Sequence, residues 1–441
     1  MYEKKVNRRI IVCKKDLIVS GEIRNFAGLN SGQTHGDPKS APHKSMISNH
    51  LTQLFNRWAF DGFSALIISM VIAAIILPNI ILISYRKRLF RADDNRKIHS
   101  GYVPRLGGVA FMPSILIALA IVVGISHLPW PEGLEYGFGQ LMTRSELAEL
   151  AFGIAAMLMI YIVGIADDIA GVSYRVKLAV QAVGAALIVC SGLRIESLGG
   201  FCGVYEIDPM VGNILTIVVV MLIVNAMNFF DGIDGLAAGL TLSALTYYAF
   251  ICFNEKCYGY FTLAMASIGA IVPFFYYNVF GKSRKHNKIF MGDTGSLTLG
   301  LLLSVAAIKC SNLGADASAG YADPAALAFS PLLLPCFDLL RVCHARIRSG
   351  VSPFKPDRTH LHHKMLAEGL SQRKATTWLV GLSAAVVAIN SALCSMEIAP
   401  HIVLGIDFAL WLIFNHALNI KLRKKLKADC KAREYYKFHN L

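Results

Sequence analysis

Charged residues are scarce in this chain, and their scarcity limits its class. Asp, Glu, Lys and Arg make up 16% of the 441 residues, whereas hydrophobic residues make up 55%. A soluble protein of this length carries about a quarter charged residues. The apolar residues stand in blocks about twenty residues long, the length that crosses a bilayer, rather than in amphipathic stripes. The composition therefore excludes an ordinary soluble domain and indicates a helical membrane protein.

Several familiar motifs are also missing. The ten cysteines are scattered and include no C-x-x-C pair, which favours small buried residues over a disulfide framework or a zinc site. No Walker motif or dinucleotide-binding glycine fingerprint is present, so the usual soluble nucleotide-binding folds are not expected. No cleavable signal peptide is visible, because the first apolar stretch is short and broken by lysines.

Eleven apolar segments are expected to cross the membrane. Because lipid cannot satisfy exposed backbone groups, the predicted fold class is an all-α integral membrane bundle. The expected segments are residues 61–84, 106–126, 149–166, 176–193, 210–227, 236–254, 257–280, 295–308, 323–343, 375–395 and 398–419. Two of them, 149–166 and 295–308, are short for a full span.

Lys and Arg are distributed unequally between the loops, and this predicts the orientation. If the first segment runs from outside to inside, the loops on one side hold 29 of these residues and those on the other side hold 4. Positive residues are retained on the cytoplasmic side. We therefore expect the N-terminus outside and the C-terminus in the cytoplasm. The net charge of +14 then reflects topology, anionic lipid and phosphorylated substrates rather than nucleic acid.

Three regions are expected along the chain. Residues 1–60 form a polar, basic extension whose charge disagrees with an outside location. One hypothesis is that translation starts near Met46; the other is a long tail that crosses the membrane regardless of charge. Residues 61–419 form the transmembrane bundle. Residues 420–441 form a basic tail expected on the inner membrane surface.

The stretch Asn225–Gly239, with the sequence NAMNFFDGIDGLAAG, lies between two apolar segments. Asp231 and Asp234 are three residues apart, so a helical backbone would place both carboxylates on one face. Carboxylates at a membrane boundary suit a site for a metal and phosphates. A solvated loop is the alternative interpretation.

Two further loops on the same side carry acids. Asp167 and Asp168 end an apolar segment, and Lys177 follows on the next. Adjacent acids at a boundary are costly unless they are paired or hydrated, so solvated capping acids are the alternative to a site. Asp293 stands in MGDTGS and is expected just before the helix that Gly295 opens. An aspartate there suits a divalent cation, although it is also an ordinary helix cap.

Basic residues accompany the acids on this side. The run Arg96–His99 is either a phosphate anchor or a topogenic loop. Asp338 and Arg341 have the spacing of an ion pair within one helix, the interpretation that we favour. A short amphipathic helix is expected over Met365–Gly369.

The loop before that helix contains Arg358, His360, His362 and His363. A His-x-His-His pattern could bind a metal or a phosphate. Anion binding is the better interpretation, because zinc prefers fewer neighbouring cations. Carboxylates and histidines thus gather on the cytoplasmic side, with hard oxygens for Mg²⁺ or Mn²⁺ and cations for phosphates. This combination predicts phosphoryl transfer between a water-soluble and a lipid substrate.

Five motifs resemble one integral-membrane family, the polyprenyl-phosphate N-acetylhexosamine-1-phosphate transferases of glycosyltransferase family 4. In order, the motifs are RKIHSGYVPRLGG, GIADDIAGVSYRVKL, NAMNFFDGIDGLAAG, FMGDTGSLTLG and SPFKPDRTHLHHKML, and they cover about residues 86–375. The last motif is more similar to the branch that uses UDP-GlcNAc than to the branch that acts on UDP-MurNAc-pentapeptide.

The resemblance implies a multi-pass enzyme of the bacterial inner membrane with its active site facing the cytoplasm. It would transfer HexNAc-1-phosphate, most simply GlcNAc-1-phosphate, from UDP-HexNAc to undecaprenyl phosphate and release UMP. The implied cofactor is Mg²⁺ or Mn²⁺. The implied partners are undecaprenyl phosphate, UDP-N-acetylhexosamine and the lipid bilayer, with a homodimer as a candidate assembly and no nucleic acid.

Roles carried over from the family's motifs divide the residues into three groups. The implied metal ligand is Asp293. The implied catalytic residues are Asp167, Asp168, Asp231 and His363, and the implied substrate-binding residues are Lys97, Lys177, Asn228, Asp234, Asn278, Arg358, His360 and His362. Gly171 stands where some relatives have a third acid, so a role for that acid is not carried over.

Three rival interpretations remain. The donor could be another UDP-sugar, such as one of N-acetylated fucosamine or quinovosamine. An anion transporter would place polar residues near the midplane in inverted repeats, whereas here they gather on one side. An inactive scaffold is disfavoured because the acids of the matched motifs are present.

Overall fold

The structure is a computed structural model. It describes residues 41–87, 89, 103–126, 128, 143–313, 324–352 and 359–428; within these, the side chains of 41–58, 324 and 426–428 are not described. Contacts divide the chain into two units, Met1–Phe55 and Asn56–Leu441. In the first unit, residues 41–55 are the beginning of helix α2 (Ala41–Lys87), which therefore contains Met46.

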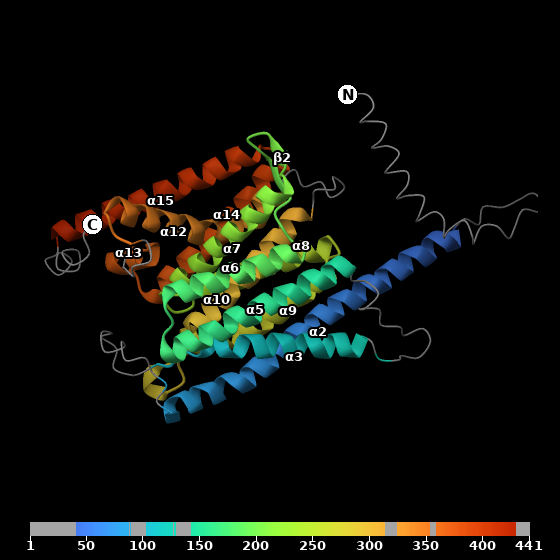
Figure 1. Ribbon diagram of the computed structural model, residues 1–441, viewed down its shortest axis with the longest axis horizontal. Helices are drawn as coiled ribbons and strands as arrows, with labels where there is room; N and C mark the ends of the chain where they lie inside the picture. Colours follow the sequence, from blue (N-terminus) through green and yellow to red (C-terminus); the bar gives the residue numbers. More distant parts are fainter. Residues whose placement is uncertain are drawn as a thin grey trace, which may run out of the picture. The chain divides into compact units, whose positions relative to one another are not determined.

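Long helices and one small hairpin make up the second unit (Figure 1). After α2 the helices are α3 (Phe111–Ser126), α5 (Arg144–Ala170), α6 (Tyr174–Cys190), α7 (Pro209–Phe230), α8 (Leu236–Asn254), α9 (Tyr258–Phe280), α10 (Gly292–Asn312), α11 (Pro324–Phe329), α12 (Leu333–Arg348), α13 (Leu361–Glu368), α14 (Gln372–Ser395) and α15 (Pro400–Ala428). Short 3-10 turns are η2 (Gly107–Ala110), η3 (Ser283–Lys285) and η4 (Ser330–Leu332). Strands β1 (Ser197–Phe201) and β2 (Val204–Glu206) pair antiparallel.

Ten of the described helical segments are long and apolar enough to cross a membrane. The prediction of an all-α membrane protein is therefore confirmed, with the small hairpin as an addition that the sequence did not indicate. The expected segment without a counterpart among the ten is 176–193, because α6 has only 17 residues.

The two segments that looked short are longer in the structure. Helix α5 begins at Arg144 because Thr143 and Glu146 form a capping box, in which each side chain accepts from the other's backbone N–H. Helix α10 begins at Gly292, so Asp293 lies in its first turn. The expectation that this aspartate precedes the helix was wrong.

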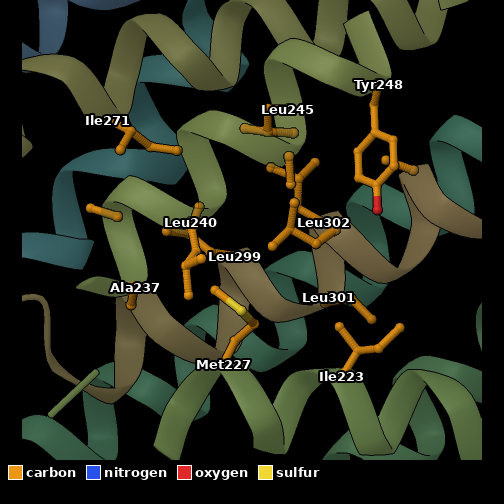
Figure 2. Packing of buried hydrophobic residues seen from close by; sticks show 14 of the residues in the cluster. Ile223, Met227, Ala237, Leu240, Leu245, Tyr248, Ile271, Leu299, Leu301 and Leu302 are labelled. Carbon is orange, nitrogen blue, oxygen red and sulfur yellow. The ribbon is translucent and has the colours of Figure 1, made fainter. Parts of the chain in front are cut away.

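Helix α10 is the buried centre of the bundle. It packs against α5, α7 and α8, and almost all of its residues are buried. Figure 2 shows Leu299, Leu301 and Leu302 of α10 among side chains of the neighbouring helices, including Leu240 of α8 and Met227 of α7. A helix surrounded in this way holds its first turn in a fixed position.

Close backbone contact locks the start of α10 to the loop before α3. A Cβ added at Gly108 would lie 2.1 Å from the backbone nitrogen of Gly295, so only glycine fits there. Gly107 N and Gly108 N donate to Phe290 O at 2.9 Å and Met291 O at 2.8 Å. These contacts join the loop before α3 directly to the loop before α10.

Connections alternate between two ends of the bundle. At one end, here called the site end, α5, α7, α9 and α12 finish and α6, α8, α10 and α14 begin. At the opposite end a buried ion pair joins Glu149 of α5 to Lys309 of α10 at 2.7 Å, and Tyr260 of α9 also donates to Glu149. This pair fixes three helices far from the site end.

Candidate active site

Three carboxylates meet at the site end. Asp167 and Asp168 lie in the last turn of α5, and Asp293 lies in the first turn of α10. One oxygen from each lies within 4.8 Å of the others. The sequence predicted acids at these two boundaries, and the structure brings them together.

Asp168 fixes the start of α10. Its Oδ1 accepts from the backbone N–H of Asp293 at 2.8 Å, and its Oδ2 accepts from the Thr294 N–H at 3.0 Å and the Thr294 hydroxyl at 2.6 Å. A negative side chain at a helix N-terminus satisfies orphan donors and complements the helix dipole. Both oxygens of Asp168 are thus engaged, although Asp168 comes from a different helix.

Lys177 of α6 lies between the other two carboxylates. Its Nζ is 3.0 Å from Asp167 Oδ2 and 2.5 Å from Asp293 Oδ2. Asp167 is fully buried, and its Oδ1 accepts from Val172 N at 2.7 Å. The Asp293 side chain is 26% exposed. An ammonium therefore occupies the point where oxygens of Asp167 and Asp293 converge.

This donor set suits a hard divalent cation. Carboxylate oxygens from two helices converge on a cation already, and Mg²⁺ takes one or two carboxylates together with substrate phosphates. Asp293 is the more open of the two, since Asp167 is buried and each of its oxygens has a partner. The residues thus fit a metal held chiefly by Asp293 with Asp167 beside it.

Asp231 ends α7 beside this cluster. Its pKa is raised well above the usual range of a carboxyl, first by burial and then by the negative charges of Asp293 and Asp168, while Arg105 opposes the shift. An aspartate in this position is poised to gain from an added cation, which would relieve the crowding of negative charge.

Asp234 has a different partner, although it lies only three residues further on. Lys288 Nζ forms an ion pair with Asp234 Oδ2, and Thr376 of α14 donates to the Asp234 carbonyl at 2.8 Å. Lys288 was not among the predicted site residues. The basic loop 281–294 was visible in the sequence, but which of its cations faces the acids depends on the fold.

The two predicted asparagines lie in different surroundings. Asn228 Nδ2 donates to Ser296 Oγ of α10 at 2.8 Å, beside the acidic cluster. Asn278 is buried, accepts from Gly235 N at 2.6 Å and donates to Ile289 O at 2.9 Å. The oxygen and the nitrogen of the Asn278 amide are therefore both hydrogen-bonded to backbone, at the start of α8 and in the loop before α10.

The histidine pattern forms the start of a helix. Helix α13 begins at Leu361, four residues before the expected one, so His362 and His363 lie within it and His360 caps it. The ring of His360 stacks on Phe229 of α7 at 5.2 Å, and the His362 ring is near Phe230 at 5.9 Å. These contacts place the histidines against the end of α7, next to Asn228.

The ring of His362 lies directly against Gly232. A Cβ at this glycine would lie 2.1 Å from His362 Nε2, so the stretch after α7 must be glycine here to admit the ring. Burial and the neighbouring His363 and His360 hold the pKa of His362 well below its usual value. His362 is therefore a neutral ring at neutral pH.

Two cations hold α13 on its other sides. Lys364 donates to Asn415 Oδ1 at 2.9 Å and Asn419 Oδ1 at 3.0 Å of α15, and burial lowers its pKa to about 8. Lys425 donates to the carbonyls of Ala367 and Glu368 at the end of α13. At least one cation of the basic C-terminal segment thus stabilises the histidine helix.

Two predicted substrate-binding residues, Lys97 and Arg358, lie outside the described residues. The remaining predicted residues gather at the site end from α5, α6, α7, α9, α10 and α13 and the stretch after α7.

Comparisons with known proteins show what the chain is similar to. Residues 150–311 match the model of a protein family described as glycosyl transferase family 4. The chain is 32% identical over 314 residues to the decaprenyl-phosphate N-acetylglucosaminephosphotransferase of Mycolicibacterium smegmatis, covering 67% of this chain and 73% of that protein. It is 29% identical over 302 residues to the undecaprenyl-phosphate alpha-N-acetylglucosaminyl 1-phosphate transferase of Yersinia pestis, with the same two shares.

A probable undecaprenyl-phosphate N-acetylglucosaminyl 1-phosphate transferase of Bacillus subtilis is 30% identical over 329 residues, which cover 74% of this chain and 83% of that protein. The fold and site define a multi-pass membrane enzyme of the transferase type. The chain belongs to glycosyl transferase family 4, and the resemblance drawn from its five motifs is confirmed.

Proposed function

We propose that the protein transfers GlcNAc-1-phosphate from UDP-GlcNAc to undecaprenyl phosphate and releases UMP. The observation that carries this proposal is the convergence of Asp167 and Asp293 on the Lys177 ammonium at the site end, where the histidines of α13 also pack against the end of α7. Relatives named for the same transfer to undecaprenyl or decaprenyl phosphate support it.

The reaction needs charge neutralisation more than covalent chemistry. An oxygen of the lipid phosphate forms a bond to the β-phosphorus of the UDP-sugar, and the bond from that phosphorus to the oxygen bridging to the α-phosphorus breaks. The electron pair leaves on UMP. A phosphate monoester is already a nucleophile, so catalysis depends on positioning and on spreading negative charge.

Asp293, with Asp167 beside it, would hold Mg²⁺ or Mn²⁺. The bound ion would supply Lewis acidity toward the diphosphate oxygens. Lys177 neutralises the same two carboxylates in this structure, and its ammonium is the natural partner for the phosphate of the lipid. Asp168 holds the turn that carries Asp293 and acts through backbone geometry.

The remaining residues surround the donor. Asp231, crowded by other acids, faces the diphosphate, while Asp234 and its partner Lys288 face the uridine side. Asn228, which bonds Ser296 of α10 from α7, would contact the donor beside them. We assign Asn278 the role of positioning Gly235 and Ile289, because its amide is used on their backbone. Histidines 360, 362 and 363 lie toward the sugar and diphosphate.

The orientation follows from the donor. UDP-sugars are made in the cytoplasm, so the site end would face the cytoplasm of a bacterial inner membrane. With α6 counted as a short span, eleven spans place the N-terminus outside and the C-terminus inside. Labelling of single cysteines at Cys190 and Cys202, at the end of α6 and in the hairpin, tests this; the proposal requires both to react from outside.

The decisive experiment is a membrane assay with labelled undecaprenyl phosphate and a panel of UDP-sugars. UDP-GlcNAc should give labelled lipid-diphosphate-sugar only in the presence of Mg²⁺ or Mn²⁺. A UDP-sugar of N-acetylated fucosamine or quinovosamine as the preferred donor would keep the reaction and change the substrate. No product with any donor would contradict the proposal.

A further inference from the structure

One buried carboxylate at the site end has no role in the reaction as described so far. Asp338 of α12 is fully buried. Its Oδ1 accepts from Arg341 Nη2 at 2.8 Å and Nε at 3.2 Å, which confirms the predicted ion pair within the helix. That pair uses only one of the two oxygens.

The other oxygen of Asp338 faces the histidine helix. Oδ2 lies 2.9 Å from His360 Nδ1 and accepts from Leu361 N at 3.2 Å. Arg341 reinforces the contact, since its Nη2 also donates to Thr359 O at 2.7 Å. One carboxylate therefore holds both the first free N–H of α13 and the imidazole before it.

The surroundings decide which atom carries the hydrogen. Arg341 and the Leu361 N–H are donors, so the Asp338 carboxylate is the acceptor of every bond it makes. His360 Nδ1 must then carry the hydrogen, which leaves Nε2 as the free end of the ring. Nε2 is buried and has no hydrogen-bond partner among the described residues.

Two rings fix the plane of this imidazole. Phe229 stacks on His360 at 5.2 Å with an interplanar angle of 22°, and His362 lies nearly parallel on it, at 5.9 Å and 7°. Rotation about the bond from Cβ to the ring would break the contact with Asp338. Both the orientation and the tautomer are thus determined by neighbours.

We propose that Asp338 is a positioning residue for the transfer: it fixes the Nδ1–H tautomer of His360 and aims Nε2 at the sugar diphosphate. This inference rests on the proposed function. A buried carboxylate that holds a histidine by one nitrogen leaves the other nitrogen with a defined role, the arrangement also seen behind histidines that bind metals.

Asp338→Asn is the informative substitution. A carboxamide offers one acceptor and one NH₂ donor where Asp338 has two acceptors. If its oxygen keeps Arg341, the NH₂ faces Nδ1, which must give up its hydrogen, and Nε2 becomes the protonated atom. We expect kcat to fall about 10–100-fold, as for other supporting carboxylates, with KM for UDP-GlcNAc changed less than about twofold because the residues proposed to bind the donor are kept.

The tautomer is read directly by ¹⁵N NMR of histidine-labelled protein, with the His360 signals identified by their loss in His360→Gln. The wild type should show the Nδ1–H form and Asp338→Asn the Nε2–H form. In a His360→Gln background, Asp338→Asn should lower kcat no further. Asn419→Leu, which loosens α13 from α15 without touching His360, is the matched control and should leave the His360 signals in place.

An Nε2–H form in the wild type would overturn the inference without any variant, even if Asp338→Asn does not fold. A changed tautomer with unchanged kcat would also overturn it, as would equal losses of kcat in Asp338→Asn with and without His360. The NMR result does not depend on the reaction. Failure of the wild type to use any UDP-sugar would instead contradict the proposed function.

Discussion

The helices α10 and α13 begin in the same way and carry opposite chemistry. Each N-terminus is held by a carboxylate from a neighbouring helix: Asp168 of α5 accepts from Asp293 N and Thr294 N, and Asp338 of α12 accepts from Leu361 N. Helix α10 then presents the carboxylate of Asp293, and α13 presents the imidazoles of His362 and His363. A cap from another helix fixes the first turn in space, whatever side chains that turn carries.

The start of α10 and the start of α13 differ in how their charges are balanced. On the α10 side, Lys177 stands between two carboxylates, at the point where a metal would be held. On the α13 side, Arg341 pairs with Asp338, and Asp338 in turn holds the buried ring of His360. We infer that the α10 side of the site binds a cation and that the α13 side binds the anion that accompanies this cation.

The largest effect expected from breaking the acidic half is that of Asp293→Asn. It should lower metal-dependent transfer by about 10³-fold, because the carboxylate most open to a metal is lost. Membrane insertion should be unchanged. Asp208→Asn at the opposite end is the matched control, since asparagine also caps a helix well, and it should keep activity within about twofold. Full activity of Asp293→Asn in the membrane assay would remove the metal assignment.

Breaking the histidine half should have the next largest effect. His363→Ala is expected to reduce kcat/KM about 10²-fold, the range for loss of a group that acts on the reacting phosphates. His416→Ala, an exposed histidine of α15, provides the control. An unchanged rate in His363→Ala would show that His363 has no part in the reaction.

Asp168→Ala sharpens the comparison by removing a cap and keeping Asp167 and Asp293. The loss of the bonds to the start of α10 should destabilise the folded protein by about 1–2 kcal/mol. The measurement is thermal unfolding in detergent without added metal. The side chain of Asp168→Asn can still accept one bond, so the melting temperature of this variant should lie between those of the wild type and Asp168→Ala. A melting temperature equal to that of the wild type would show that the cap does not matter.

The smallest expected effect concerns pH. The pKa of His362 is depressed in the folded state, so the unfolded chain takes up a proton as pH falls below about 6.5 while the folded protein does not. His362 therefore lowers stability as pH falls through this range. His362→Leu should lose less melting temperature between pH 7.5 and 5.5 than the wild type, whereas His416→Leu should behave as the wild type. Equal losses in all three would contradict the shift.

Much of this organisation could be predicted from sequence because it is local. Runs of apolar residues mark the spans, and acids such as Asp167 and Asp231 stand at their ends. Spacing also identified the pair of Asp338 with Arg341, three residues apart. The bond from Asp338 to His360, 22 residues on, was not predicted, because periodicity reports neighbours on the same helix only.

The same limit explains the other omissions. Asp168 caps a helix 125 residues later, and Lys288 pairs with Asp234 across 54 residues. Each partner was visible as a charge in a loop, but the choice between several loop cations depends on helix packing. Asn278 was assigned to substrate binding by the family resemblance, and its backbone contacts emerge only when the start of α8 and the loop before α10 meet.

The most direct test of the central claim follows the phosphorus. Membranes containing the protein are given undecaprenyl phosphate and UDP-GlcNAc labelled with ³²P at the β-phosphate. Transfer of GlcNAc-1-phosphate predicts that the label moves to the lipid fraction in a one-to-one ratio with the sugar, and that the released nucleotide is unlabelled UMP. Label remaining in UDP while the sugar alone moves to lipid would contradict the account.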